Sequence, residues 1–178
     1  MNVFKSYYVH ASYSFSQLTP KNYIFALRDL LLARLTNPKN ITFHFPLEIM
    51  FASMINIKKG NSYVEWVEAV AKKLGVLVVW ENIAFLNEKD WSLKEQAIWK
   101  YIPKNVSLCL DTGHIILGEK NPKKKILQIV GKYGKRIKHL HLHENDLIHD
   151  LHLPPGKILK PLMKYLTKGR TWIIEPPS

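Results

Sequence analysis

The chain alternates between short apolar runs and longer segments in which apolar residues recur at helical spacing. The runs are rich in β-branched residues, which favours strands. They cover residues 6–10, 41–45, 76–80, 106–110, 137–141 and 171–174. Strands that alternate with helices are typical of right-handed βαβ units. The pattern therefore predicts an α/β fold with a parallel sheet that helices cover on at least one face.

The segments between the runs predict helices with recognisable ends. Four apolar stripes at helical spacing are Ile24/Leu27/Leu31/Leu35, Tyr63/Trp66/Val67/Val70/Leu74, Ile126/Ile129/Val130/Tyr133 and Ile158/Leu159/Leu162/Met163/Leu166. A further helix is expected over 91–101, capped by Ser92. Thr19 followed by Pro20 predicts a helix start. Gly75 and Gly134 follow the second and third stripes and predict helix ends.

The length and the composition limit the class of protein. With 178 residues and 47% hydrophobic residues, the chain can bury the core of a single domain over 1–178. No apolar run approaches the roughly 20 residues of a membrane span, and the first residues lack a signal-peptide core. A lone Cys109 excludes an internal disulfide. Together these features predict a cytoplasmic protein.

The net charge of +12 has two interpretations. Clustered Lys and Arg bind a phosphate backbone because they release its counterions, so the charge is compatible with a nucleic-acid partner. A Lys-rich composition that keeps a protein soluble gives the same net charge. The basic residues of 123–125 and 132–138 are spread over a helix and the start of a strand. Charge alone therefore leaves both interpretations open.

Potential metal ligands stand at the ends of all six predicted strands. They are His10, His44, Glu81, Asp111, His141 and Glu175, separated by 30 to 37 residues, the length of one βα unit. This spacing places them at the same C-terminal edge of the sheet, where parallel α/β folds build their sites. Imidazole nitrogen and carboxylate oxygen suit zinc, manganese and iron. Any one of these residues alone could be an ordinary buried hydrogen-bonding group, but six in phase indicate a metal site.

Nearby residues extend the site. His114 follows Asp111 by three positions, and Asp150 precedes His152 by two, so one loop can supply two ligands to one ion. His139 and His143 share the strand face of His141. Of these three, His141 is the expected ligand, and His143 is expected to donate a hydrogen bond to a ligand.

These residues resemble those of a known superfamily, the xylose-isomerase-like barrels, which include endonuclease IV and many sugar isomerases and epimerases. The resemblance covers nearly the whole chain and rests on HASYS, TFHFP, VVWEN, CLDTGH, HLHEND, DLHLPPG and IIEPP. It implies a (β/α) TIM barrel of about six βα units, with the first two units missing at the N-terminus. Two unpaired strand edges would follow, at 6–10 and 171–174, and exposed apolar edges promote association. We therefore expect a homodimer contact, a complementing chain or a local rearrangement to cover them.

The resemblance to endonuclease IV implies up to three zinc ions. His10, His44 and Glu81 would hold the first; Glu81 would bridge to a second, held with Asp111, His141 and Glu175; His114, Asp150 and His152 would hold the third. Tyr13 resembles the residue that this nuclease inserts beside a damaged nucleotide. The implied reaction is hydrolysis of a phosphodiester at an abasic site in DNA repair, with Glu81 as a bridging ligand and Glu175 orienting or deprotonating the water.

Two other functions remain open. A sugar or sugar-phosphate isomerase or epimerase would use one Mn²⁺ or Mg²⁺ held by Glu81, Asp111, His141 and Glu175. Glu81 and Glu175 would then move a proton next to a carbonyl. The other possibility is a non-catalytic remnant, or one part of a split barrel, whose ligands persist without a complete pocket.

Overall fold

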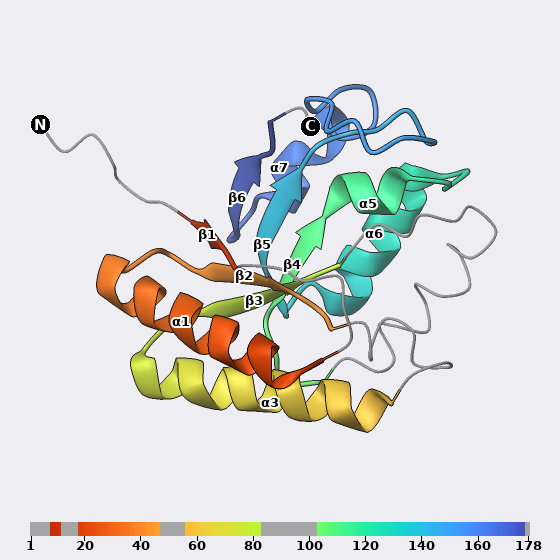
Figure 1. Cartoon of the computed structure of the whole chain (residues 1–178). Helices are drawn as coiled ribbons and strands as arrows, with labels where there is room; N and C mark the ends of the chain where they lie inside the picture. The colour runs from red at the N-terminus through yellow and green to blue at the C-terminus, as the bar shows by residue number, and fades with distance from the viewer. Residues whose placement is uncertain (1–7, 12–17, 47–55, 83–102, 177–178) are drawn as a thin grey trace, which may run out of the picture. The chain divides into compact units, whose positions relative to one another are not determined.

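The computed structural model describes residues 8–11, 18–46, 56–82 and 103–176, and the chain divides into two compact units (Figure 1). The first unit comprises Met1–Trp80 and Gln96–Val106, and the second comprises Glu81–Glu95 and Ser107–Ser178. That 1–178 forms a single domain stays a prediction. The predicted helix over 91–101, with its Ser92 cap, lies outside the described residues.

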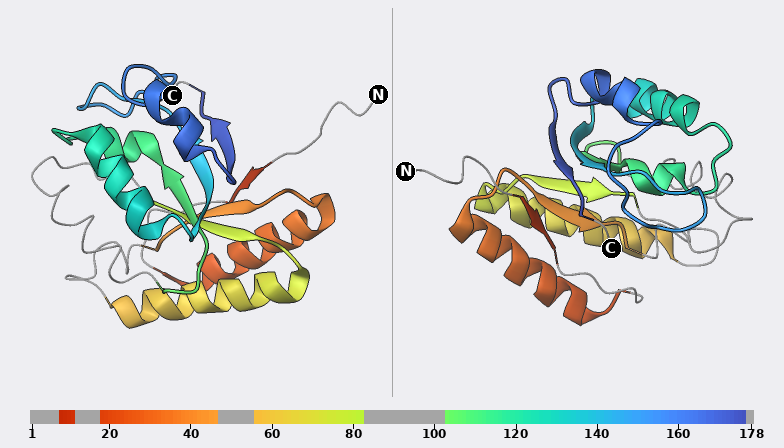
Figure 2. Two further views of the ribbon diagram at one scale, coloured as in Figure 1. Left: turned by 180° about the vertical axis from the view of Figure 1, so that it is seen from behind. Right: turned by 90° about the horizontal axis from the view of Figure 1, so that it is seen from above.

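The first unit consists of strands and long helices in alternation. Its elements are β1 (Val9–His10), α1 (Pro20–Thr36), β2 (Ile41–His44), α3 (Ile57–Leu74) and β3 (Val78–Glu81), whose last residue belongs to the second unit. β1 pairs with β2 in parallel, with Val9 opposite Ile41. The Ile41 N–H donates to Leu77 O at 2.9 Å, which ties β2 to the segment that leads into β3. Both helices lie on the same face of β2 and β3 (Figure 2).

Sequence signals mark the ends of these helices. Thr19 is the N-cap of α1, and its backbone N–H and hydroxyl donate to Asn22 Oδ1 at 2.8 and 2.9 Å. α3 ends at Gly75, which has a φ of +67°. This left-handed conformation closes a helix at low cost only where a Cβ is missing. The predicted start at Pro20 and the predicted end at Gly75 are therefore confirmed.

The second unit has the same alternation with shorter helices. Its elements are β4 (Leu108–Asp111), α5 (Thr112–Ile116), α6 (Pro122–Tyr133), β5 (Ile137–Leu142), the 3₁₀ helix η2 (Lys160–Leu162), α7 (Met163–Leu166) and β6 (Thr171–Ile174). β4 pairs with β5 and β5 with β6, all in parallel. The register places Asp111 opposite His141, and His141 opposite Ile173. α5 packs on α6 and on β5.

Five of the six strand predictions agree with the structure to within two residues at either end, and residues 6 and 7 of the sixth lie outside the described part. The prediction of an α/β fold with parallel strand pairs is confirmed. The fourth stripe was expected to form one helix, but it forms η2 and the single-turn α7. Only Leu159 and Leu166 of that stripe are buried.

The first stripe does not mark the packing face of α1. Ile24 and Leu35 of this stripe are 64% and 80% exposed. The buried residues of α1 are Ala26, Asp29, Leu30 and Ala33. α1 contacts α3, where the Tyr23 ring packs edge-on against the rings of Tyr63 and Trp66. Hydrophobic periodicity alone selected the wrong face because α1 carries apolar residues on nearly every side.

This reversal predicts the effect of two matched substitutions. Leu30→Ala removes a fully buried side chain and should lower the free energy of unfolding by about 2–5 kcal/mol. Leu35→Ala, on the same helix, should change it by less than about 0.5 kcal/mol because that side chain is 80% exposed. Urea unfolding of the two variants measures both values. Equal losses, or a larger loss for Leu35→Ala, would contradict this orientation of α1.

Candidate metal centre

The structure places all six predicted strand-end residues at the C-terminal ends of their strands. His10, His44, Glu81 and Asp111 are the last residues of β1 to β4, His141 is the penultimate residue of β5, and Glu175 directly follows β6. Parallel pairing aligns these ends within each unit. These six residues form one set in the first unit and one in the second, and a further set in the second unit is formed by other histidines and Asp150.

The set in the first unit is a pair of histidines. The rings of His10 and His44 lie 4.6 Å apart between centroids. His10 is opposite Thr42 in the register, so His44 stands two residues further along β2 on the same face. Both rings are at least partly accessible to solvent. That Glu81 joins them around one ion stays a prediction.

The first set in the second unit, hereafter the strand-end group, consists of Glu81, Asp111, His141 and Glu175. One ligand atom from each of these residues lies within 4.8 Å of the others. His141 Nδ1 is 2.7 Å from Glu81 Oε1, 2.9 Å from Glu175 Oε1 and 3.8 Å from Asp111 Oδ2. Three carboxylates therefore surround one nitrogen.

This arrangement fits a divalent cation. One N–H can donate to only one of the carboxylates at full strength, and the like charges of the others repel each other in a buried site. A cation bound among four such atoms interacts with all three carboxylates at once. The nitrogen and oxygen donors match the preferences of zinc and manganese.

The same charges shift the protonation of the histidines. Burial opposes the charged form of His141, but the negative charge of Glu81 and the hydrogen bond with Glu175 outweigh it and raise the pKa of His141 well above its ordinary range. His139, two residues earlier on β5, behaves in the opposite way. Burial and the charge of His141 lower the pKa of His139 to about 4, and its Nδ1 lies 2.7 Å from the Thr171 hydroxyl. The negative charge therefore lies around His141 and not around His139. This favours His141 as the ligand of a cation.

Cys109 lies in a separate buried cluster with His139 and His141. Burial raises the pKa of the Cys109 thiol to about 12. Only the thiolate is a strong metal ligand. In the metal-free protein Cys109 is therefore a neutral, buried thiol at neutral pH.

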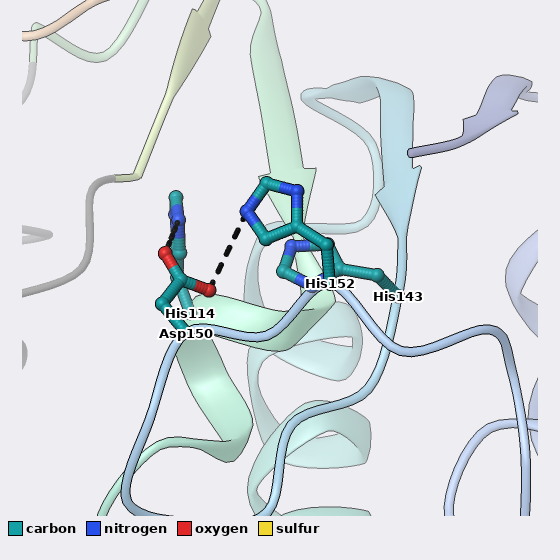
Figure 3. A group of neighbouring side chains, drawn as sticks. All are labelled: His114, His143, Asp150 and His152. Carbon is teal, nitrogen blue, oxygen red and sulfur yellow. Dashed lines mark ion pairs between the residues drawn. The ribbon is translucent and has the colours of Figure 1, made fainter. Parts of the chain in front are cut away.

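The second set in the second unit, hereafter the loop group, consists of His114, His143, Asp150 and His152 (Figure 3). Asp150 lies between two histidines, with Oδ2 at 3.4 Å from His114 Nε2 and Oδ1 at 3.5 Å from His152 Nε2. Burial opposes ionisation of Asp150, but the hydrogen bonds from His114 and Asn145 lower its pKa to about 2. The structure therefore brings together the residues His114, Asp150 and His152 that the sequence had grouped.

The start of α5 positions His114. Asp111 is the N-cap of this helix, and its Oδ1 accepts from the His114 backbone N–H at 2.9 Å. The His114 ring is held through Nδ1, which lies 2.8 Å from Asn82 O. Burial opposes the charged form of His114, but Asp111 and Asp150 raise its pKa to about 10. A proton on this ring would have to leave before the ring bound a cation.

His143 connects the two groups. Its Nε2 lies 2.9 Å from Asp111 Oδ1 and 3.4 Å from Glu175 Oε2, while its ring packs on the His152 ring at 4.1 Å between centroids. Its buried Nδ1 has no hydrogen-bond partner among the described residues. The contact with Asp111 is the one expected of a histidine that orients a ligand, and the free Nδ1 adds a nitrogen to the loop group.

Several contacts at the site were not predicted from the sequence. The Asn82 amide binds the Asp111 backbone on both sides, with Nδ2 donating to Asp111 O at 3.0 Å and Oδ1 accepting from Asp111 N at 2.9 Å. The Thr112 hydroxyl lies 3.1 Å from both His141 O and His143 O. Asn82 directly follows a strand-end ligand, and this adjacency was the available signal. Tyr13 lies outside the described residues, so its predicted contact with substrate stays a prediction.

No helix in the described ranges is long and apolar enough to span a membrane.

Gly113 leaves the space that His143 occupies, and this yields a prediction. A Cβ at Gly113 would lie 1.9 Å from His143 Cε1, so Gly113→Ala must displace the buried ring. We expect a loss of about 1–3 kcal/mol in stability and weaker zinc binding, measured by chemical unfolding and competition with a chelator. Gly131→Ala is the control, because a Cβ at this α6 position meets no atom within 4 Å and alanine favours a helix. If both variants bind zinc equally well, Gly113 has no such role.

Comparisons with known proteins agree on the fold. Among solved structures, a D-tagatose 3-epimerase-like protein matches with a TM-score of 0.66 and 20% identity, over 94% of this chain and 70% of its own. Endonuclease IV from Thermus thermophilus matches with a TM-score of 0.66 and 19% identity, over 96% and 69%. The TTHB071 protein of the same organism, soaked with ZnCl₂, matches with a TM-score of 0.67 and 18% identity, over 97% and 72%.

At these identities the similarity shows the fold alone. A search of curated proteins finds no significant match. The family comparison is decisive, since residues 62–174 match the xylose isomerase-like TIM barrel family. With six parallel strands and alternating helices, the fold is an incomplete barrel of this type, as predicted. The chain therefore belongs to the xylose isomerase-like TIM barrel family.

Proposed function

We propose that this protein is a metal-dependent phosphodiester hydrolase, similar to endonuclease IV, that acts at abasic sites in DNA repair. The observation that carries the proposal is the loop group, His114, His143, Asp150 and His152, beside the complete strand-end group. A one-metal isomerase needs only the strand-end group. Chemistry at a phosphodiester gains from several cations, since charge develops on both the attacking and the leaving oxygen.

Zinc is the proposed cation at these groups, up to three ions in all if His10 and His44 take part with Glu81. The donor sets support zinc because they combine imidazole nitrogen with carboxylate oxygen. Bound there, zinc would lower the pKa of a water molecule and neutralise charge on the phosphate.

Glu175 is the residue of this chain best placed to handle the proton. It is only 15% exposed and reaches both groups, through His141 at 2.9 Å and His152 Nδ1 at 3.5 Å. Burial opposes its ionised form, but the hydrogen bond from His141 outweighs this and lowers the pKa of Glu175. An ionised carboxylate between the two groups can orient a water molecule and accept its proton. Glu81 is proposed as a second charged ligand and contacts the same His141 nitrogen at 2.7 Å.

The charge of +12 supports a DNA partner, because phosphate contacts carry affinity without sequence preference. Tyr13 is proposed to contact the substrate beside the abasic site. We further propose a cytoplasmic location. A second copy or a complementing chain is proposed to cover the strand edges at 6–10 and 171–174.

A specific observation also favours a second candidate, a sugar or sugar-phosphate isomerase or epimerase. Glu81 and Glu175 contact the same nitrogen of His141, so the two carboxylates lie close together in the strand-end group. Two such carboxylates can remove and return a proton next to a substrate carbonyl. This function would use one Mn²⁺ or Mg²⁺ and gives the loop group no role. A remnant or one part of a split barrel is the third possibility.

The nuclease proposal predicts nicking of a DNA duplex that contains one abasic site. The zinc-loaded protein should cleave the duplex and lose the activity on treatment with a chelator, as followed on a denaturing gel. Glu81→Gln should lower the rate by more than about 100-fold because it removes a charged ligand. Glu65→Gln, on the exposed face of α3, is the matched control and should be fully active. Absence of chelator-sensitive nicking would exclude the nuclease, and full activity of Glu81→Gln would exclude this site.

Metal stoichiometry separates the three candidates. We expect about three zinc ions per chain for the nuclease, because the histidines and carboxylates form three ligand sets. The isomerase requires one manganese or magnesium ion, and the remnant requires none. Elemental analysis of protein dialysed against each metal measures the value. A single ion per chain would favour the isomerase over the nuclease.

A further inference from the structure

The loop that carries Asp150 and His152 lacks a packed core of its own. Between Asp146 and Leu153 its residues are exposed or half-buried, including the apolar Leu147, Ile148 and Leu151. A loop without buried apolar contacts is held in place only by its polar interactions. Yet Figure 3 shows Asp150 and His152 projecting from it toward His114 and His143.

Glu144 holds the base of the loop. Glu144 and Leu153 form an isolated antiparallel bridge through two backbone hydrogen bonds of 2.6 and 2.7 Å. The Glu144 carboxylate also accepts from three backbone donors, Gly156 N at 2.6 Å, Ile158 N at 3.0 Å and Leu159 N at 2.6 Å. These contacts close the loop at its base but touch neither of the two potential ligands.

The neighbouring residue, Asn145, makes the contacts that do reach the ligands. It is only 5% exposed. Its Nδ2 donates to Asp150 Oδ1 at 3.0 Å, and its Oδ1 accepts from Leu151 N at 2.7 Å and from His152 N at 3.1 Å. One amide therefore fixes the carboxylate of Asp150 and the backbone on which His152 is mounted.

The Asn145 amide contacts a residue with an unusual backbone conformation. His152 has a φ of +49°, in the left-handed region that residues with a Cβ adopt at a cost. Such a conformation persists where surrounding contacts determine it, and these residues are frequent at functional sites. The hydrogen bond from His152 N to Asn145 is the contact that stabilises the conformation. It turns the His152 ring toward Asp150 and onto His143.

We propose that Asn145 is the positioning residue of the loop group: its amide sets Asp150 and His152 in place before a cation binds. The inference deepens the proposed function and rests on the loop group being a metal site. If Asp150 and His152 are already in position, the loop does not have to become ordered when a cation binds. The entropic cost of ordering the loop then does not reduce the metal affinity. Asn145 itself is not a ligand, and it acts through Asp150 and His152.

The test compares zinc binding by the full-length wild type with that of three variants. Asn145→Ala should lower the affinity of the loop group for its zinc ion about 10- to 100-fold. Loss of a hydrogen bond to a metal ligand typically has an effect of this size. Zinc ions bound at the other sites should keep their affinity. Asp150→Ala shows which of the measured zinc affinities belongs to the loop group, because it removes one of that group's ligands. Competition with a chelating indicator measures each affinity, and circular dichroism reports the fold.

Asp146→Ala is the matched control. Asp146 is the next residue in the same loop and also accepts two backbone hydrogen bonds, from Ile148 N at 2.9 Å and His149 N at 2.6 Å, but it contacts no member of the loop group. Its removal should change zinc affinity by less than about twofold, within the range of surface substitutions. Equal affinities in Asn145→Ala and Asp146→Ala would overturn the proposal. If Asp150→Ala loses no zinc, the loop group is not a metal site. In that case the proposed metal site fails, and the result does not bear on Asn145.

Hydrogen exchange tests the same inference on the wild type and does not depend on the folding of a variant. In metal-free protein, the amides of Leu151 and His152 should exchange at least about tenfold more slowly than unstructured amides, although their loop is exposed. Exchange at the unprotected rate, with protection that arises only when zinc is added, would mean that the cation orders the loop. That result would overturn the positioning role of Asn145.

Discussion

The strand-end group depends on the compensation of buried negative charge. Glu81 and Asp111 are almost completely buried, and Glu175 lies close to both around His141. Two like charges about 4 Å apart repel by about 4 kcal/mol at an effective dielectric constant of 20. Positive charge between them, from a protonated histidine or from a cation, compensates this repulsion. The raised pKa of His141 is one form of this compensation, and a bound cation would be the other.

The parallel register determines which residues share that charge. Asp111 is opposite His141, and Glu175 follows Ile174, which is opposite Leu142. This alignment follows from the βα repeat, so the spacing of polar residues predicted that the strand ends share one edge of the sheet. The resemblance to the barrel superfamily implied which four of them form the strand-end group. The sequence could also group Asp150 with His152, since two residues of one loop separated by one position can reach the same ion.

The sequence could not reveal the contacts that depend on tertiary packing. The space for the His143 ring exists because residue 113 is a glycine, but an isolated glycine in a sequence has many possible reasons. The amides of Asn82 and Asn145 appear as ordinary polar residues until the chain path brings their partners near. Likewise, the buried face of α1 carries Ala26, Asp29, Leu30 and Ala33, and not most of the large apolar residues of the helix.

The two candidate reactions make different demands on the loop group. An isomerase with one metal ion would need no buried amide to fix Asp150, no left-handed His152 and no histidine at 143 in contact with both groups. Each of these features carries a cost in strain or desolvation. Costs of this kind, concentrated around residues that share one small volume, are typical of a functional site and favour a second centre beside the first. The loop group is therefore the feature on which the proposed phosphodiester hydrolysis depends.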